Sequence, residues 1–183
     1  LNEMATGDQS GSWGTVTNLN LELIGEAFSY GTEAITTNAD THTTTIADGA
    51  SDAGRSMFLK YTGTLDSACT ITIGPNTVSK MWFIENATSG SQNIIISQGS
   101  GANVTIPAGQ TKAVYSDGAG AGAAFVDAFN SLSVGTLTSS GITYPTSDGS
   151  NGQALVTNGS GTISFGSAGI STGKAIAMAI VFG

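Results

Sequence analysis

The chain has 183 residues, of which 39% are hydrophobic and only 10% are charged, and its formal net charge is −8. Ordinary globular domains contain about 25% charged residues, so this chain relies on neutral polar side chains and glycine. Disordered chains combine high charge with few apolar residues, and this composition argues against that class. Its five Lys and Arg residues are scattered. They form no positive stripe for phosphates, which argues against nucleic-acid binding.

Charge is distributed unevenly along the chain. Asp148 is the only one of the thirteen acidic residues that lies after position 130, and Lys174 is the only base there. A segment this long with two charged side chains is poorly solvated by itself. We therefore expect the C-terminal part to bury much of its surface against other chains.

Neither a disulfide nor a membrane helix is predicted. Cys69 is the single cysteine, which excludes an intrachain disulfide, and its alternating neighbours in "ACTITIG" indicate a small buried hydrophobe. The longest apolar run, 175–182, is far shorter than the roughly 20 residues that cross a bilayer, and no signal peptide is visible. Because the chain begins with Leu1 rather than Met, we expect a fragment or a processed product.

One helix is predicted near the start of the chain, within residues 11–31. Thr17 or Asn18 can cap it, Gly31 can end it, and apolar residues recur at helical spacing at Leu19, Leu23, Ile24 and Phe28. A helix of about three turns cannot form a core alone. Its apolar face is therefore expected to dock on a β domain or on a partner protein.

Residues 1–32 are thus predicted to be an N-terminal anchor. Trp13 precedes the helix and is a candidate for the docking contact, together with Leu19, Leu23 and Phe28. The alternative, that Trp13 covers local core, has equal weight.

Residues 33–129 alternate between strand-like and turn-like stretches. Thr70 and Thr72 alternate with Ile71 and Ile73, and the run "KMWFIEN" alternates in the same way. Roughly seven or eight short strands at 8–12-residue spacing predict an all-β domain, either a β-sandwich or a β-roll.

Residues 130–183 form an extended, turn-rich β segment with very short strands. Each strand places one or two apolar residues, such as Leu155, Ile163 and Phe165, among Ser, Thr and Gly. So little apolar area cannot offset the backbone entropy of about 1–2 kcal/mol per residue. Such strands become stable when they stack on copies of themselves.

The closing stretch "GKAIAMAIVFG" is predicted to be a strand with two apolar faces. One face carries Ile176, Met178, Ile180 and Phe182, and the small residues of the other face permit close approach of a neighbouring chain. An intertwined homo-oligomer is the preferred interpretation, and a buried intrachain strand is the second.

No catalytic, cofactor or metal site is predicted. His42 is the sole histidine and has no local nucleophile motif, so a solvated strand histidine is the better interpretation. The run "GAGAG" lacks the Lys-Ser/Thr of a phosphate loop, and one His with one Cys excludes a zinc site. The acids that could form a glycosidase pair lie mostly in turn-like contexts: Asp40, Asp48, Asp52, Asp66 and Glu85.

Two segments resemble structural proteins of tailed bacteriophages, especially marine phage fibres. Residues 5–28, "ATGDQSGSWGTVTNLNLELIGEAF", are similar to a Gly-x-Trp-Gly…Thr-Asn-x-Asn segment near the start of such proteins. Residues 141–167, "GITYPTSDGSNGQALVTNGSGTISFGS", resemble a Tyr-Pro…Asp-Gly…Gly-Gln-x-Leu pattern of tail fibres, and "STGKAIAMAIVFG" is similar to the end of marine phage fibres.

The resemblance implies a homotrimer on the virion surface, held to other virion proteins by its N-terminal part and facing a host receptor, either glycan or protein. It implies host attachment without catalysis, cofactors, nucleic acid or membrane insertion. A head-bound capsid fibre or decoration protein shares the same features. A fibre-borne polysaccharide depolymerase is a weaker alternative, because such enzymes use carboxylate pairs on longer β-helices.

Overall fold

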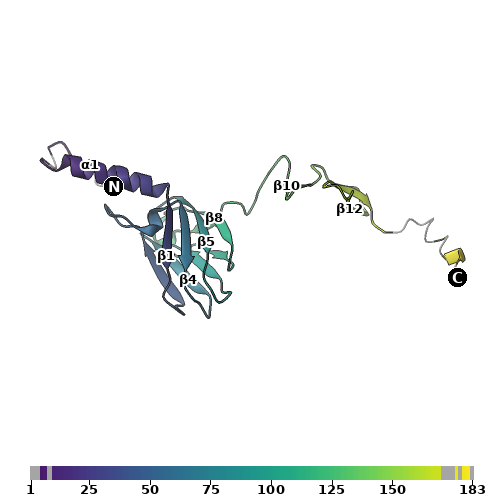
Figure 1. Cartoon of the computed structure of the whole chain (residues 1–183), viewed down its shortest axis with the longest axis horizontal. Coiled ribbons are helices and arrows are strands. Elements are labelled where there is room, and N and C mark those ends of the chain that lie inside the picture. The colour runs from purple at the N-terminus through teal and green to yellow at the C-terminus, as the bar shows by residue number, and fades with distance from the viewer. Residues whose placement is uncertain (1–4, 8–9, 170–175, 177–178, 182–183) are drawn as a thin grey trace. The chain divides into compact units, whose positions relative to one another are not determined.

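The computed structural model describes residues 5–7, 10–169, 176 and 179–181. The chain divides into two compact units, Leu1–Ser131 and Leu132–Gly183. Figure 1 shows helix α1 and the labelled strands β1, β4, β5 and β8 in the first unit, and strands β10 and β12 in the second. Most regular structure is β-strand, which confirms the all-β prediction.

Helix α1 (Trp13–Ala27) begins and ends earlier than the sequence indicated. It starts after Ser12, whose carbonyl accepts the first helical bond from the Val16 amide at 3.1 Å. The predicted caps Thr17 and Asn18 are therefore wrong, because both lie inside the helix. Their lower helix propensity is worth only a few tenths of a kcal/mol and does not stop a helix.

Gly31 was predicted to end the helix, and this prediction is wrong. It lies in strand β1 (Tyr30–Ala34). It is buried there, and a Cβ atom would lie 2.6 Å from the Ala53 carbonyl oxygen in the short 3-10 helix η1 (Ala53–Arg55). Glycine is needed at this position for a close approach between two segments.

The first unit contains two sheets. The five-stranded sheet has the order β1, β3 (Phe58–Thr62), β5 (Met81–Asn86), β8 (Thr111–Ser116) and β9 (Phe125–Asp127). The four-stranded sheet has the order β2 (Thr41–Thr45), β4 (Cys69–Gly74), β6 (Ile94–Ser97) and β7 (Val104–Ile106). The first six strands alternate between the two sheets, and within each sheet these strands pair in parallel. Strands β7, β8 and β9 then pair antiparallel, and η2 (Gly120–Gly122) precedes β9.

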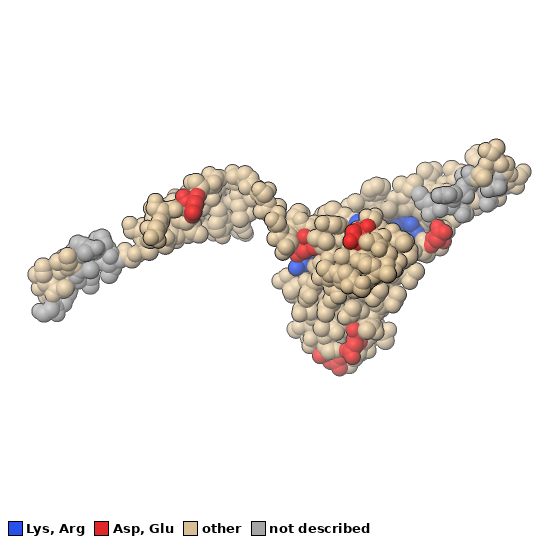
Figure 2. All heavy atoms as spheres, turned by 180° about the vertical axis from the view of Figure 1, so that it is seen from behind, with Lys and Arg blue, Asp and Glu red and all other residues tan. Residues whose placement is uncertain are grey.

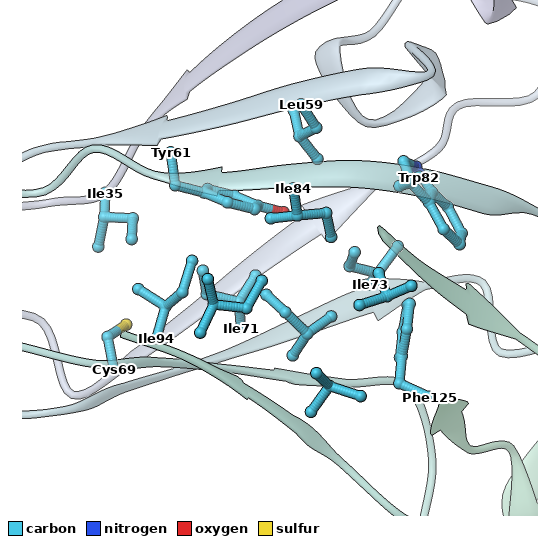
Figure 3. Packing of buried hydrophobic residues seen from close by; sticks show 14 of the residues in the cluster. Ile35, Leu59, Tyr61, Cys69, Ile71, Ile73, Trp82, Ile84, Ile94 and Phe125 are labelled. Atoms are coloured by element: carbon cyan, nitrogen blue, oxygen red, sulfur yellow. The ribbon is translucent and has the colours of Figure 1, made fainter. Parts of the chain in front are cut away.

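The core lies between these sheets, as Figure 3 shows for Leu59, Ile84 and Trp82 facing Ile71 and Ile94. Alternate residues of β3, β4 and β5 are buried, which is the pattern of strands with one face in a core. The buried Trp82 indole donates to the Gly54 carbonyl at 2.8 Å. Cys69 is a fully buried free thiol, which confirms its predicted role as a small hydrophobe. Burial raises the pKa of this thiol, and the nearby Asp40 carboxylate adds to the rise.

The second unit contains two antiparallel hairpins. The first pairs β10 (Thr138–Ser139) with β11 (Ile142–Thr143), and the second pairs β12 (Gln153–Thr157) with β13 (Ile163–Ser167). A single parallel bridge between Thr143 and Thr162 joins the hairpins. No residue between positions 132 and 169, all of which the structure describes, is buried.

The closing stretch differs from the predicted strand in its described residues. Ile176 and residues 179–181 are helical. An isolated strand leaves its backbone groups unpaired, whereas a helix satisfies them within one segment, and alanine is the best helix former. The strand prediction for the whole stretch extends over residues that lie outside the described ones, Met178 and Phe182 among them.

Candidate functional site

The β12–β13 hairpin gathers three of the predicted interface residues on one face. Leu155 lies directly opposite Phe165, and Ile163 lies opposite Thr157, two positions along. Because successive side chains alternate between faces, Leu155, Ile163 and Phe165 share one face of the hairpin. The structure therefore turns three dispersed apolar residues into a single stripe.

The turns around this hairpin hold the stripe in place. The Asn158 side-chain oxygen accepts hydrogen bonds from the Ser160 and Thr162 amides at 2.8 and 3.1 Å, which shapes the β12–β13 loop. Gly149 lies against the Phe165 ring, and a Cβ atom on this glycine would be 2.5 Å from a ring carbon. The Asp-Gly and Asn-Gly dipeptides of this region thus serve chain reversal and packing.

The stripe is only partly covered within its own unit. Leu155 is 52% exposed. Further exposed apolar residues of this unit are Leu132, Val134, Leu137, Ile142 and Val156. Asp148 is the only charged residue between positions 132 and 169, and Figure 2 shows this segment as an almost uncharged surface. Such a surface can associate with other apolar surfaces.

Two further interface candidates lie in the closing stretch. Ile176 and Ile180 are exposed, at 54% and 77%. The other two, Met178 and Phe182, lie outside the described residues.

The structure separates the four anchor candidates of helix α1. Leu23 is only 2% exposed and Leu19 is half-buried, so this face of the helix packs against the rest of the first unit. Glu26 strengthens the contact, because its Oε1 accepts hydrogen bonds from the Ser51 hydroxyl at 2.5 Å and the Asp52 amide at 3.1 Å. Arg55 Nε lies 3.5 Å from the Glu26 Oε2 atom.

Trp13, on a different face of the helix, is 67% exposed, and Phe28, which directly follows the helix, is 71% exposed. Leu21 and Ile24, also exposed, fall on the same helical face. We call these four residues the helix stripe. Sequence reasoning omitted Leu21, although its spacing of four residues from Thr17 and three from Ile24 could have placed it there.

A third apolar surface covers part of the outer face of the five-stranded sheet. Parallel pairing places Tyr30, Phe58 and Phe83 side by side on three strands. The Tyr30 and Phe58 rings stack with centroids 5.1 Å apart. Met81 lies opposite Tyr115 on the next row. Sequence reasoning missed this surface, because no sequence signal gives the parallel register that aligns these residues.

Several of the polar residues considered for catalysis have structural partners. His42 Nε2 lies 2.7 Å from Glu33 Oε1, which ties β2 of one sheet to β1 of the other. The nearby Tyr61 hydroxyl lies 2.7 Å from the Thr44 hydroxyl, and burial strongly raises the tyrosine pKa. Asp40 accepts a hydrogen bond from the Ser67 hydroxyl. Among the described residues, no three His, Cys, Asp or Glu side chains gather to hold a metal ion.

Each of the four described cations has a partner in its own chain. Arg55 pairs with Asp52 at 3.1 Å, Lys60 with Glu85 at 3.5 Å and Lys112 with Asp127 at 2.8 Å. Lys80 donates to the carbonyl oxygens of Arg55 and Ser56, and its Nζ lies 4.9 Å from the Trp82 ring centroid. Desolvation lowers the pKa of Lys80 to about 8. The surface therefore offers these cations poorly to an anionic ligand.

No protein-family model, curated protein or solved structure matches the chain. In the described ranges, no helix has the length and apolar character needed to span a bilayer.

Proposed function

We propose that the chain is the subunit of a homotrimeric tailed-bacteriophage fibre, a structural protein of the virion surface that serves host attachment. The observation that carries this proposal is the second unit: hairpins with an apolar stripe and no buried residue between positions 132 and 169. Two further copies supply the missing partners, because each stripe can pack on its equivalents around a shared axis. The resemblance of residues 141–167 to tail fibres supports the same assignment.

The remaining parts take roles that fit this architecture. Four parallel strand pairings, two in each sheet, join strands that alternate between the sheets along the chain, and they favour a short β-roll over a sandwich for the 33–129 domain. The helix stripe supplies exposed apolar side chains that a second virion protein can cover. The first unit presents its loops to the host.

Mass in solution tests the proposal. The chain weighs 18.3 kDa, so a trimer sediments at three times this mass, about 55 kDa. A species of 18.3 kDa that remains monomeric at high protein concentration overturns the trimer.

Position on the particle tests the assignment to a tail fibre. An antibody raised against residues 33–129 labels tails in electron micrographs of intact particles if the proposal is right. Label on the head instead identifies a capsid fibre or decoration protein.

A further inference from the structure

An open groove lies at the edge of the first unit, between strands β7 and β9. These strands belong to different sheets, and they are tied at one end by a hydrogen bond from the Phe125 amide to the Ala102 carbonyl at 2.8 Å. Beyond this bond, β7 pairs with β6 in one sheet and β9 pairs with β8 in the other, so β7 and β9 separate. The space between them has a volume of about 370 Å³, which lies within the range of small-molecule sites.

The groove combines an apolar floor with polar walls. Val104 and Phe125 are buried beneath it. Val126 borders the groove, but its side chain alternates with those of Phe125 and Asp127 and lies with Tyr115 on the outer face of the sheet. Asn103 and Asn130 line the walls, and the hydrogen bonds of the described residues leave both side-chain amides free. Each free amide offers two donors and one acceptor to a ligand.

An ion pair lies in the same groove. Lys112 Nζ donates to Asp127 Oδ2 at 2.8 Å, and Asp127 Oδ1 accepts the Phe129 amide at 3.1 Å. The Lys112 hydrogen bond, with the Phe129 amide, lowers the pKa of Asp127. Both side chains keep partial exposure, at 32% and 25%. The pair therefore presents donors and acceptors at fixed positions while its charges cancel.

This combination selects the chemistry of the ligand. A phosphate or sulfate needs an unmatched cation, and Lys112 is matched by Asp127. A cationic ligand needs an unmatched carboxylate, and Asp127 is already matched by Lys112. A purely apolar ligand leaves the amides of Asn103 and Asn130 without partners, which costs free energy. An uncharged ligand with several hydroxyl groups and an apolar C–H face satisfies all of these groups.

We propose that the β7–β9 groove binds a neutral sugar residue of a glycan. The sugar lays its C–H face over the floor at Val104 and Phe125, and its hydroxyl groups exchange hydrogen bonds with Asn103, Asn130 and the Lys112–Asp127 pair. In the fibre this glycan belongs to the host surface. That last point alone rests on the proposed function; the sugar site itself does not.

Nuclear magnetic resonance titration of the full chain tests the site. The probes are neutral hexasaccharides of glucose, mannose and N-acetylglucosamine, with a heparin hexasaccharide as the anionic comparison. We expect at least one neutral probe to bind in the millimolar range and to shift the side-chain amide signals of Asn103 and Asn130. The double variant Asn103→Ala/Asn130→Ala binds it at least about tenfold more weakly, since each net hydrogen bond is worth about 1 kcal/mol.

Asn93→Ala is the matched control, because Asn93 is an exposed asparagine of the same unit that does not line the groove. It leaves affinity unchanged. The proposal is overturned if no neutral probe binds, if the shifts lie elsewhere, if the double variant binds as well as the native chain, or if heparin is preferred in the groove. A trimer that binds no sugar refutes the groove alone, and a monomer that binds sugar refutes the fibre alone.

Discussion

Truncation of Leu155 to alanine tests whether the hairpin stripe holds the trimer together. Leu155 is 52% exposed in the single chain and lies opposite Phe165. In a trimer built on this stripe, the exposed half of the side chain becomes buried in each of the three copies. The substitution removes most of that apolar area without adding charge or bulk, so any loss of assembly reports burial.

The expected magnitude follows from the exposed fraction. Complete burial of a leucine side chain contributes about 1.5–3 kcal/mol, so the exposed half contributes roughly 1 kcal/mol per chain and about 3 kcal/mol per trimer. This lowers the association constant about 100-fold. The midpoint concentration of a monomer–trimer equilibrium varies as the inverse square root of that constant, so it rises about tenfold.

Sedimentation equilibrium over a dilution series measures this midpoint. Leu21→Ala is the matched control: it is the same chemical change at a residue that is 61% exposed on helix α1. We expect the control to assemble like the native chain, and the circular dichroism of both variants to stay unchanged. A midpoint within twofold of the native value for Leu155→Ala, or an equal shift for Leu21→Ala, contradicts the assignment of the interface to the hairpin.

Three further predictions concern the two units separately. Asn86→Ala should lower the unfolding free energy of the first unit by about 2–3 kcal/mol in urea titration, because alanine removes two hydrogen bonds that the buried amide donates to carbonyls at 3.0 Å and one that it accepts from the Thr88 hydroxyl at 2.7 Å; an unchanged midpoint contradicts this role. Gly149→Val should disrupt the hairpin, since its Cβ would lie 2.5 Å from the Phe165 ring, and retained β12–β13 nuclear Overhauser contacts would show that reasoning to be wrong. Lys80, with a pKa of about 8 against the ordinary 10.5, should make the unfolding free energy rise between pH 8 and 10.5, because the unfolded chain holds the proton that the folded one has lost. Lys80→Met should flatten that rise, and an equally steep profile in the variant would assign it to another group.

The sequence by itself was sufficient for features that depend on local pattern. Alternation of apolar and polar residues marked "CTITIG" as a strand, and the structure buries Cys69, Ile71 and Ile73 of that strand. Helical spacing indicated one helix near the start of the chain. The turns of the second unit followed from their Asn-Gly dipeptides, since Gly152 and Gly159 have φ values of +85° and +74°, a region that glycine occupies without strain.

Only the tertiary structure decided which distant residues meet. Tyr30, Phe58 and Phe83 form one surface because parallel pairing aligns strands about 25 residues apart in sequence, and no local signal encodes that register. The β7–β9 groove likewise arises because neighbouring segments join different sheets. The ends of helix α1 and the helical residues of the closing stretch were missed for a related reason. Propensity differences of a few tenths of a kcal/mol are smaller than the packing and hydrogen-bonding terms that decide such segments.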